Sequence, residues 1–160
     1  MTDPIHMTDD EVLWENIYLT CNTLQRAREL ELAQVGLTMA QAGVLYFLTI
    51  AKEPLTPMKL SRLMHKQPHT ISALLSRMEA DGLLKTTKDL ERKNWVRVSL
   101  TNKGKQAFNR QMTQKLARSV TSCLSKKEKD AIAPVCKKLR LHATEIIRQM
   151  QPGPYSDMLV

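Results

Sequence analysis

Residues 56–85 contain two helix-start signals in close succession, and this constrains the fold more than any other feature of the sequence. Thr56 is a good N-cap, and Pro57 follows it at the first helical position. Pro68 repeats the proline signal after Gln67, which is a weaker cap. Two helices that start so close together require a short first helix and a tight turn between them.

Apolar side chains follow each start signal at helical spacing, so each predicted helix has one buried face. We expect these helices over residues 57–64 and 68–80, because Asp81-Gly82 then supplies a helix stop. Their apolar faces comprise Leu60, Leu63 and Met64 in the first helix and Ile71, Leu74, Leu75 and Met78 in the second. A short helix, a tight turn and a second helix with a polar leading face form the helix-turn-helix pattern. Its usual role is to place the second helix in the DNA major groove.

Beyond Gly82 the hydrophobic period changes from about 3.6 to about 2 residues, which predicts strands. The two strands are expected over residues 83–87 and 95–100, joined by the charged loop 88–94. Such a charge run is more often only a solvated loop, but its position after a helix-turn-helix favours a wing. The sequence therefore predicts a winged helix-turn-helix over residues 38–100.

Long helices are predicted on both sides of this part. One runs over residues 9–35, and another starts at the capping box formed by Thr38 and Gln41. Thr101 is expected to cap one long helix with apolar residues spaced by four through Val120. Ser125 begins a last helix to about residue 150, in which Pro134 is expected to produce a kink or a break. The fold class is thus mainly α with a small antiparallel β wing, in a single domain over residues 1–160 with flanking helices at 9–35 and 101–150.

The net charge of +8 is unevenly distributed along the 160 residues. Residues 1–50 carry seven acidic and two basic side chains, a net charge of −5, whereas residues 51–110 carry thirteen basic and five acidic ones, a net charge of +8. The remaining residues 111–160 have a net charge of +5. Positive charge on and after the helix-turn-helix is what a polyanion-binding surface requires.

The sequence lacks the signals of several other classes of protein. The three cysteines are odd in number and widely spaced, unlike a disulfide framework, and no histidine stands at metal-ligand spacing from a cysteine or an acid. No glycine-rich phosphate loop, nucleophile elbow or His-Glu motif is present, so neither an enzyme nor a cofactor is expected. No membrane span or secretory signal is visible, and we expect a cytoplasmic protein without a membrane partner.

Two motifs carry a resemblance to a known family. The segment KLSRLMHKQPHTISALLSRMEADGLL at residues 59–84 matches, without a gap, the pattern of the MarR family of transcription regulators. The segment VSLTNKG at residues 98–104 resembles that family's junction between the wing and the following helix. The resemblance extends over about residues 10–150.

The resemblance implies a homodimer whose terminal helices interlock and whose winged parts bind double-stranded DNA at a pseudo-palindromic operator. It also implies a small-molecule effector, with a pocket between the dimer helices and the winged part. Repression is the more frequent mode of action. One alternative is a winged helix that acts as a protein-binding or architectural module. The other is an oxidant-sensing repressor that uses Cys21, since some members of the family sense oxidants through a cysteine in the N-terminal helix. A cysteine in an apolar stripe is, however, more often a small buried hydrophobe.

Polar residues on the leading edge of the second helix are the candidates for base contacts. They are Gln67, His69, Thr70, Ser72 and Ser76, together with Ala73, whose methyl group can contact a thymine methyl. Arg77, further along the same helix, could reach a phosphate or instead pair with Glu79 or Asp81. The candidates for phosphate contacts are Lys59, Arg62 and Lys66 on the first helix and turn, and Lys88, Arg92, Lys93 and Asn94 in the wing. Counting from Leu100, Arg92 stands where relatives often have an acid, so either the wing loop is one residue longer or that acid is absent.

Overall fold

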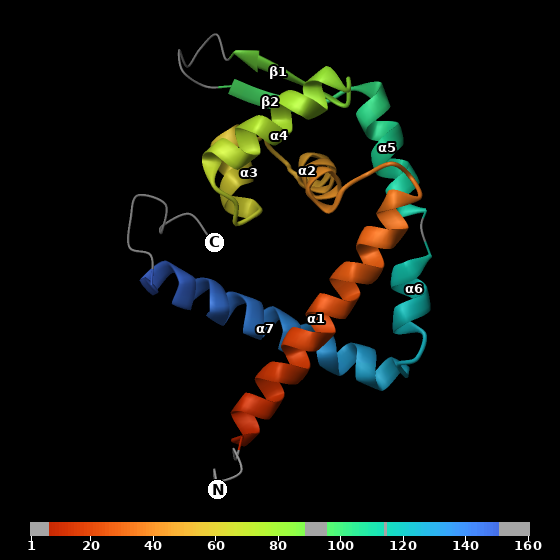
Figure 1. Ribbon diagram of the computed structural model, residues 1–160, viewed down its shortest axis with the longest axis vertical. Helices are drawn as coiled ribbons and strands as arrows, with labels where there is room; N and C mark the ends of the chain where they lie inside the picture. The colour runs from red at the N-terminus through yellow and green to blue at the C-terminus, as the bar shows by residue number, and fades with distance from the viewer. Residues whose placement is uncertain (1–6, 89–95, 114, 151–160) are drawn as a thin grey trace, which may run out of the picture.

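The computed structural model describes residues 7–88, 96–113 and 115–150, and it confirms the predicted fold class. The elements are α1 Asp9–Ala33, α2 Met39–Ile50, α3 Pro57–Leu63, α4 Pro68–Ala80, β1 Leu84–Lys88, β2 Val96–Leu100, α5 Asn102–Met112, α6 Leu116–Thr121 and α7 Lys126–Met150. The winged part, from α2 to the start of α5, gathers at one end of the molecule (Figure 1). Helix α1 extends away from it, and α7 lies in the opposite half.

Cap hydrogen bonds confirm the predicted helix starts except at Gln67, which forms no side-chain cap bond. The Thr38 hydroxyl accepts the backbone N–H of Gln41 at 3.2 Å, and the Gln41 side chain accepts the Thr38 N–H at 2.9 Å. Thr8 and Ser125 form equivalent boxes with Glu11 and Glu128. These side chains satisfy backbone donors that a helix start would otherwise leave open, so local sequence alone determines where these helices begin.

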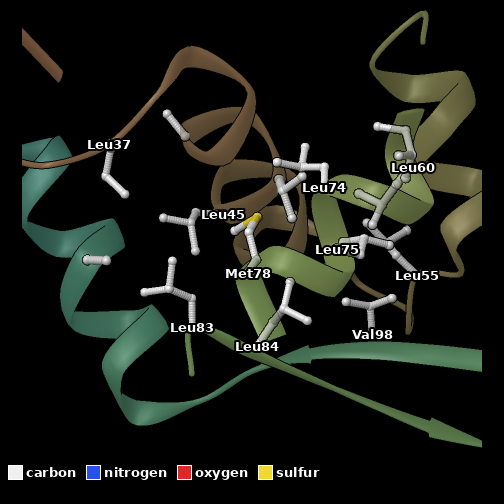
Figure 2. Close-up of a cluster of buried hydrophobic side chains, with 14 of the residues drawn as sticks. Leu37, Leu45, Leu55, Leu60, Leu74, Leu75, Met78, Leu83, Leu84 and Val98 are labelled. Atoms are coloured by element: carbon white, nitrogen blue, oxygen red, sulfur yellow. The ribbon is translucent and has the colours of Figure 1, made fainter. Parts of the chain in front are cut away.

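The hydrophobic core lies inside the winged part. Figure 2 shows Met78 of α4 between Leu45 of α2 and Leu84 of β1. Leu60 of α3 and Ile71 of α4 are also completely buried. Leu60 of α3 and the four apolar residues of α4 thus face this core, which holds α4 with its polar face outward. The prediction that Leu63 belongs to the buried face of α3 is wrong, since its side chain is 45% exposed.

The wing is an antiparallel pair in which Leu84 lies opposite Leu100 and Lys88 lies opposite Val96. Leu55 extends the sheet by one residue, since its carbonyl accepts the N–H of Val98 at 2.9 Å. The loop between α2 and α3 is therefore tied directly to the wing.

The prediction of one long helix after Thr101 is wrong. Helix α5 ends at Met112, and α6 begins separately at Leu116. The Glu31 carboxylate of α1 accepts the Leu116 N–H at 2.7 Å, and the Thr113 hydroxyl donates to the Arg110 carbonyl at 2.8 Å. In a continuous helix, the Leu116 N–H would donate to a backbone carbonyl of the preceding turn. Here its acceptor is instead a side chain of α1, which is distant in the sequence.

Pro134 does not break α7, which continues from Lys126 to Met150. A proline cannot donate to the carbonyl four residues earlier, here that of Asp130. Asp130 is exposed, so water can replace the missing donor, and the helix persists past the proline.

The two longest helices bury very little in the single chain. In α1 only Glu31 and Leu32 are buried, and in α7 no residue is buried. Large apolar side chains are exposed instead, including Trp14 at 65% and Val135 at 55%. Within the described ranges, no helix combines the length and apolar character needed to cross a membrane.

Candidate nucleic-acid interface

The turn between α3 and α4 is fixed by a buried serine. The Ser61 hydroxyl donates to the Lys66 carbonyl at 2.7 Å, and the Lys66 N–H donates to the Ser61 carbonyl at 2.9 Å. His65 between them adopts a left-handed conformation with φ of 50°. These bonds set the angle at which α4 leaves the turn. Sequence reasoning missed the role of Ser61, because a serine in a short helix is not by itself distinctive.

Helix α4 separates its two faces as predicted. Ile71, Leu74, Leu75 and Met78 are buried in the core. All seven residues of α4 and its N-cap that are proposed for DNA contacts are exposed, which leaves their side chains available to a partner: Gln67, His69, Thr70, Ser72, Ala73, Ser76 and Arg77.

The N-terminus of α4 keeps backbone donors open. Gln67 stands at the N-cap and forms no side-chain cap bond, and the first intrahelical bond runs from the Ile71 N–H to the Gln67 carbonyl at 3.1 Å. Pro68 has no N–H, so the donors of His69 and Thr70 point outward from the exposed end. Such a helix end favours a phosphate group.

Arg77 pairs with neither of the acids considered from the sequence. Its Nε donates to the Ala73 carbonyl of the same helix at 3.3 Å. Glu79 instead accepts the Thr86 backbone N–H at 2.6 Å and the Thr86 hydroxyl at 2.9 Å. Through these two hydrogen bonds, Glu79 links α4 to β1.

The scaffold candidates differ in their environments. Lys66 is exposed in the turn beside α4. Lys59 forms an ion pair with Glu53, with Nζ and Oε2 3.6 Å apart, and Arg62 is only half-exposed, with its Nε buried. Lys66 is therefore the member of this set whose charge is most directly presented to a partner.

In the wing, Lys88 is exposed at the end of β1. The other three wing candidates, Arg92, Lys93 and Asn94, lie outside the described residues. Two further basic side chains, Lys85 and Arg97, are exposed on the same ladder, and sequence reasoning did not single them out. The sequence signal that could have identified them is the two-residue alternation of a strand, because each of them is next to an inward-facing residue.

The wing is anchored to α4 and α5 by a compact set of bonds. The Thr101 hydroxyl donates to the Gly82 carbonyl at 2.6 Å and accepts the Gly104 N–H at 3.1 Å. Lys103 Nζ donates to the Asp81 carbonyl at 2.7 Å. Gly82 itself has φ of 70°, which favours glycine. The end of α4 and the start of α5 are thus bonded directly to each other beside the wing.

No three His, Cys, Asp or Glu side chains come together as a metal-binding group among the residues described. Cys21, Cys123 and Cys136 are free and exposed. The interpretation of Cys21 as a small buried hydrophobe is therefore wrong for the single chain, in which the only buried residues of α1 are Glu31 and Leu32 at its C-terminal end.

Comparisons with known proteins agree with this geometry. The MarR family model matches residues 35–93. The ligand-free structure of the organohalide-sensing RdhR-CbdbA1625 transcriptional regulator is 27% identical with a TM-score of 0.78, covering 100% of this chain and 95% of that chain. Its form bound to 2,4-dichlorophenol is 28% identical with a TM-score of 0.74, covering 89% of this chain and 88% of that one.

A mutant MarR from Escherichia coli, solved in complex with operator DNA, is 22% identical with a TM-score of 0.71, covering 79% of this chain and 92% of that chain. At that identity the likeness concerns the fold alone. A search of curated proteins finds no match.

Proposed function

This chain belongs to the MarR family of DNA-binding transcription regulators, and from that premise we propose that it is a homodimeric repressor of a pseudo-palindromic operator. The observation that carries the proposal is the exposed polar face of α4, which is held outward by a core on its opposite face. A recognition helix needs this arrangement, because its base-reading side chains must reach the major groove while the helix stays fixed. Control of transcription on the chromosome places the protein in the cytoplasm.

The contacts divide between reading and positioning. Thr70, Ser72 and Ser76 offer hydroxyl groups to base edges, and Ala73 offers a methyl group to thymine. No arginine stands at the leading edge of α4, so much of the electrostatic attraction must come from Lys66 and the basic wing. Phosphate contacts of this kind position the helix without specifying sequence.

The homodimer is supported by the exposed apolar surface of the terminal helices. A monomer rarely exposes so many large apolar side chains on two neighbouring elements, and a second copy would cover them symmetrically. On α1 these include Leu13, Trp14, Tyr18 and Leu19, and on α7 Ile132, Val135, Leu139, Leu141 and Ile146.

The proposed mechanism is steric. A dimer bound across a promoter blocks it, and the half-sites then lie about one helical turn, roughly 34 Å, apart. A small-molecule effector releases the operator only if it prefers a dimer with different spacing of the two α4 helices. The RdhR-CbdbA1625 regulator was solved with 2,4-dichlorophenol bound, which supports an effector for this chain as well.

Selection of bound fragments from genomic DNA tests the function. We expect an enriched palindrome bound at least about 10³-fold more tightly than random DNA at the same salt concentration. Thr70→Ala combined with Ser72→Ala should reduce that preference while leaving random-sequence binding nearly unchanged. A protein that binds all sequences alike would instead be an architectural or protein-binding module.

Sedimentation tests the dimer. Val135→Asp places a charge on the apolar face of α7 and should convert the dimer into monomers. Lys138→Gln on the same helix changes the net charge by the same amount and should leave the dimer intact, because Lys138 is not part of the apolar set. If both variants sediment as the wild type does, α7 is not the interface.

Oxidant sensing by Cys21 stays a second candidate, since its thiol is free. Under this hypothesis, peroxide releases the wild-type protein from its operator, whereas Cys21→Ser binds the operator and is not released. Peroxide release of the Cys21→Ser variant would rule out Cys21 as the sensor.

A further inference from the structure

Glu79 is an acidic residue beside the proposed DNA-binding surface. It lies on the last turn of α4 and is exposed. Two exposed candidates for phosphate contacts, Lys66 and Lys88, precede and follow it in the chain. A negative charge at this place repels DNA phosphates, so the charge of Glu79 alone would lower the affinity for DNA.

The carboxylate of Glu79 is bonded to the middle of strand β1. It accepts the Thr86 backbone N–H at 2.6 Å, and the Thr86 hydroxyl also donates to it at 2.9 Å. Strand β1 follows α4 in the chain and turns back alongside it (Figure 1). The two hydrogen bonds therefore close the turn between the recognition helix and the wing.

The pairing of the two strands leaves the Thr86 N–H without a partner in the ladder. Thr86 lies opposite Val98, and the Val98 N–H donates away from the ladder, to the Leu55 carbonyl at 2.9 Å. In an antiparallel pair, opposite residues bond to each other through both N–H groups or through neither. The Thr86 N–H thus points to the outer edge of β1, where Glu79 accepts it. One cross-strand pair is therefore held from both edges of the wing.

Basic side chains of the wing lie beyond this pair. Lys88 and Arg97 are both exposed, and both are closer than the pair to the loop that joins the strands. Because the wing is held at both edges, the direction in which its strands leave α4 is fixed. Phosphate contacts set the register and orientation of a protein on the duplex. The distance from Lys88 to the base-reading face of α4 therefore matters for binding.

We infer that Glu79 is a positioning residue for DNA binding, which holds the wing at the angle to α4 at which Lys88 reaches a phosphate. This role rests on the proposed function and deepens it. An acid with only an electrostatic effect lowers DNA affinity, so its removal raises affinity. Removal of a positioning acid has the opposite sign, because the wing loses its hydrogen bonds to α4.

Fluorescence anisotropy with a duplex of random sequence, measured across a salt series, tests this role. Glu79→Ala should bind at least about fivefold more weakly than the wild type, with a slope of log K against log salt concentration smaller by about one unit. Glu79→Gln keeps a carbonyl oxygen as the acceptor and should bind at least as tightly as the wild type. Asp81→Ala is the matched control and should not lower affinity. It removes the same charge two residues away, and the bond of Asp81 with Lys103 uses the backbone carbonyl.

A double-variant cycle separates positioning from a general loss of stability. In the Glu79→Ala background, Lys88→Gln should have little further effect on affinity or slope, because the lysine has already left its phosphate. A protein that is merely destabilised would keep the full effect of Lys88→Gln. Thr86→Val removes only the hydroxyl donor and leaves α4 unchanged. It should lower affinity about twofold, and it tests the same contact if Glu79→Ala does not fold.

An affinity of Glu79→Ala equal to or above that of the wild type overturns the inference. A full effect of Lys88→Gln in the Glu79→Ala background overturns it too, as does equally weak binding by Glu79→Gln and Glu79→Ala. If Glu79→Ala does not fold, wild-type affinity in Thr86→Val has the same consequence. A wild-type protein that binds no duplex would contradict the proposed function, and the role of Glu79 would fail with it.

Discussion

Glu31 accepts the backbone N–H of Leu116 at 2.7 Å, although the two residues are 85 positions apart in the chain. The same carboxylate pairs with Arg28, whose guanidinium also donates to the Gln111 carbonyl at 3.4 Å. Glu31 is only 8% exposed. The contacts of Glu31 and Arg28 therefore hold the end of α1, the end of α5 and the start of α6 in place relative to one another.

Glu31→Ala should lower the free energy of unfolding by about 2–3 kcal/mol, because it leaves the part-buried Arg28 guanidinium without its ion-pair partner and the Leu116 N–H without its acceptor. Urea denaturation measures the change. Glu29→Ala is the control, since the Glu29–Arg26 pair is largely exposed, and it should cost less than about 1 kcal/mol. Equal losses for the two variants would contradict the structural role of Glu31.

Gly104→Ala should be strongly destabilising, because a Cβ at this position would lie 1.9 Å from the Leu83 carbonyl oxygen. That oxygen belongs to the backbone beside the wing and cannot move without disturbing it, so we expect a loss of at least about 2 kcal/mol. Gly43→Ala is the matched control. Its Cβ would meet only the flexible end of Met64 at 3.1 Å, and the gain in helix propensity offsets the contact. Thermal unfolding of the two variants distinguishes these outcomes.

Lys88→Gln should weaken DNA binding about equally for all sequences and reduce the slope of log K against log salt concentration by about one unit. The physical reason is that a lysine at the end of β1 neutralises a phosphate and releases a counterion without reading a base. Fluorescence anisotropy across a salt series gives the slope. Lys127→Gln, on exposed α7, is the control and should keep the wild-type slope. A loss of operator preference in Lys88→Gln would contradict this assignment.

Acidification should weaken the start of α7. Hydrogen bonds from the Ser125 side chain and backbone lower the pKa of Glu128. A lowered folded-state pKa contributes stability above the unfolded value of about 4.3, and this contribution is lost as the pH falls through the folded pKa. In Glu128→Gln the free energy of unfolding should therefore fall less steeply below about pH 4.5. Ser125→Ala should reduce the same pH dependence, whereas an unchanged profile in both variants would exclude this box as its source.

Local signals explain most of the winged part. The caps at Thr38 and Thr56, the stop at Gly82 and the apolar spacing of α4 each act within a few residues, so the sequence was sufficient to predict these elements and the buried face of α4. The exposed face of α4 followed from the same spacing, and with it the candidate residues of the interface.

The break between α5 and α6 could not be predicted in this way, because the group that caps α6 is Glu31 on a different helix. The same limit applies to Ser61, whose hydroxyl fixes the turn, and to Gly104, whose need for glycine arises from the Leu83 carbonyl. A pocket lined by the end of α2, loop 51–55, strand β2 and helix α5 is also a product of packing, since Lys52, Arg97 and Lys105 in its lining have no common spacing along the chain.

By itself the sequence determined which segments form helices and strands and which face of each is apolar, because capping and periodicity act over a few residues. Only the tertiary structure decided where α5 stops, how the turn before α4 is fixed and which basic side chains share a pocket. Those features depend on hydrogen bonds and contacts between residues far apart in the chain. Such residues come into contact only when the core has formed and brought their elements together.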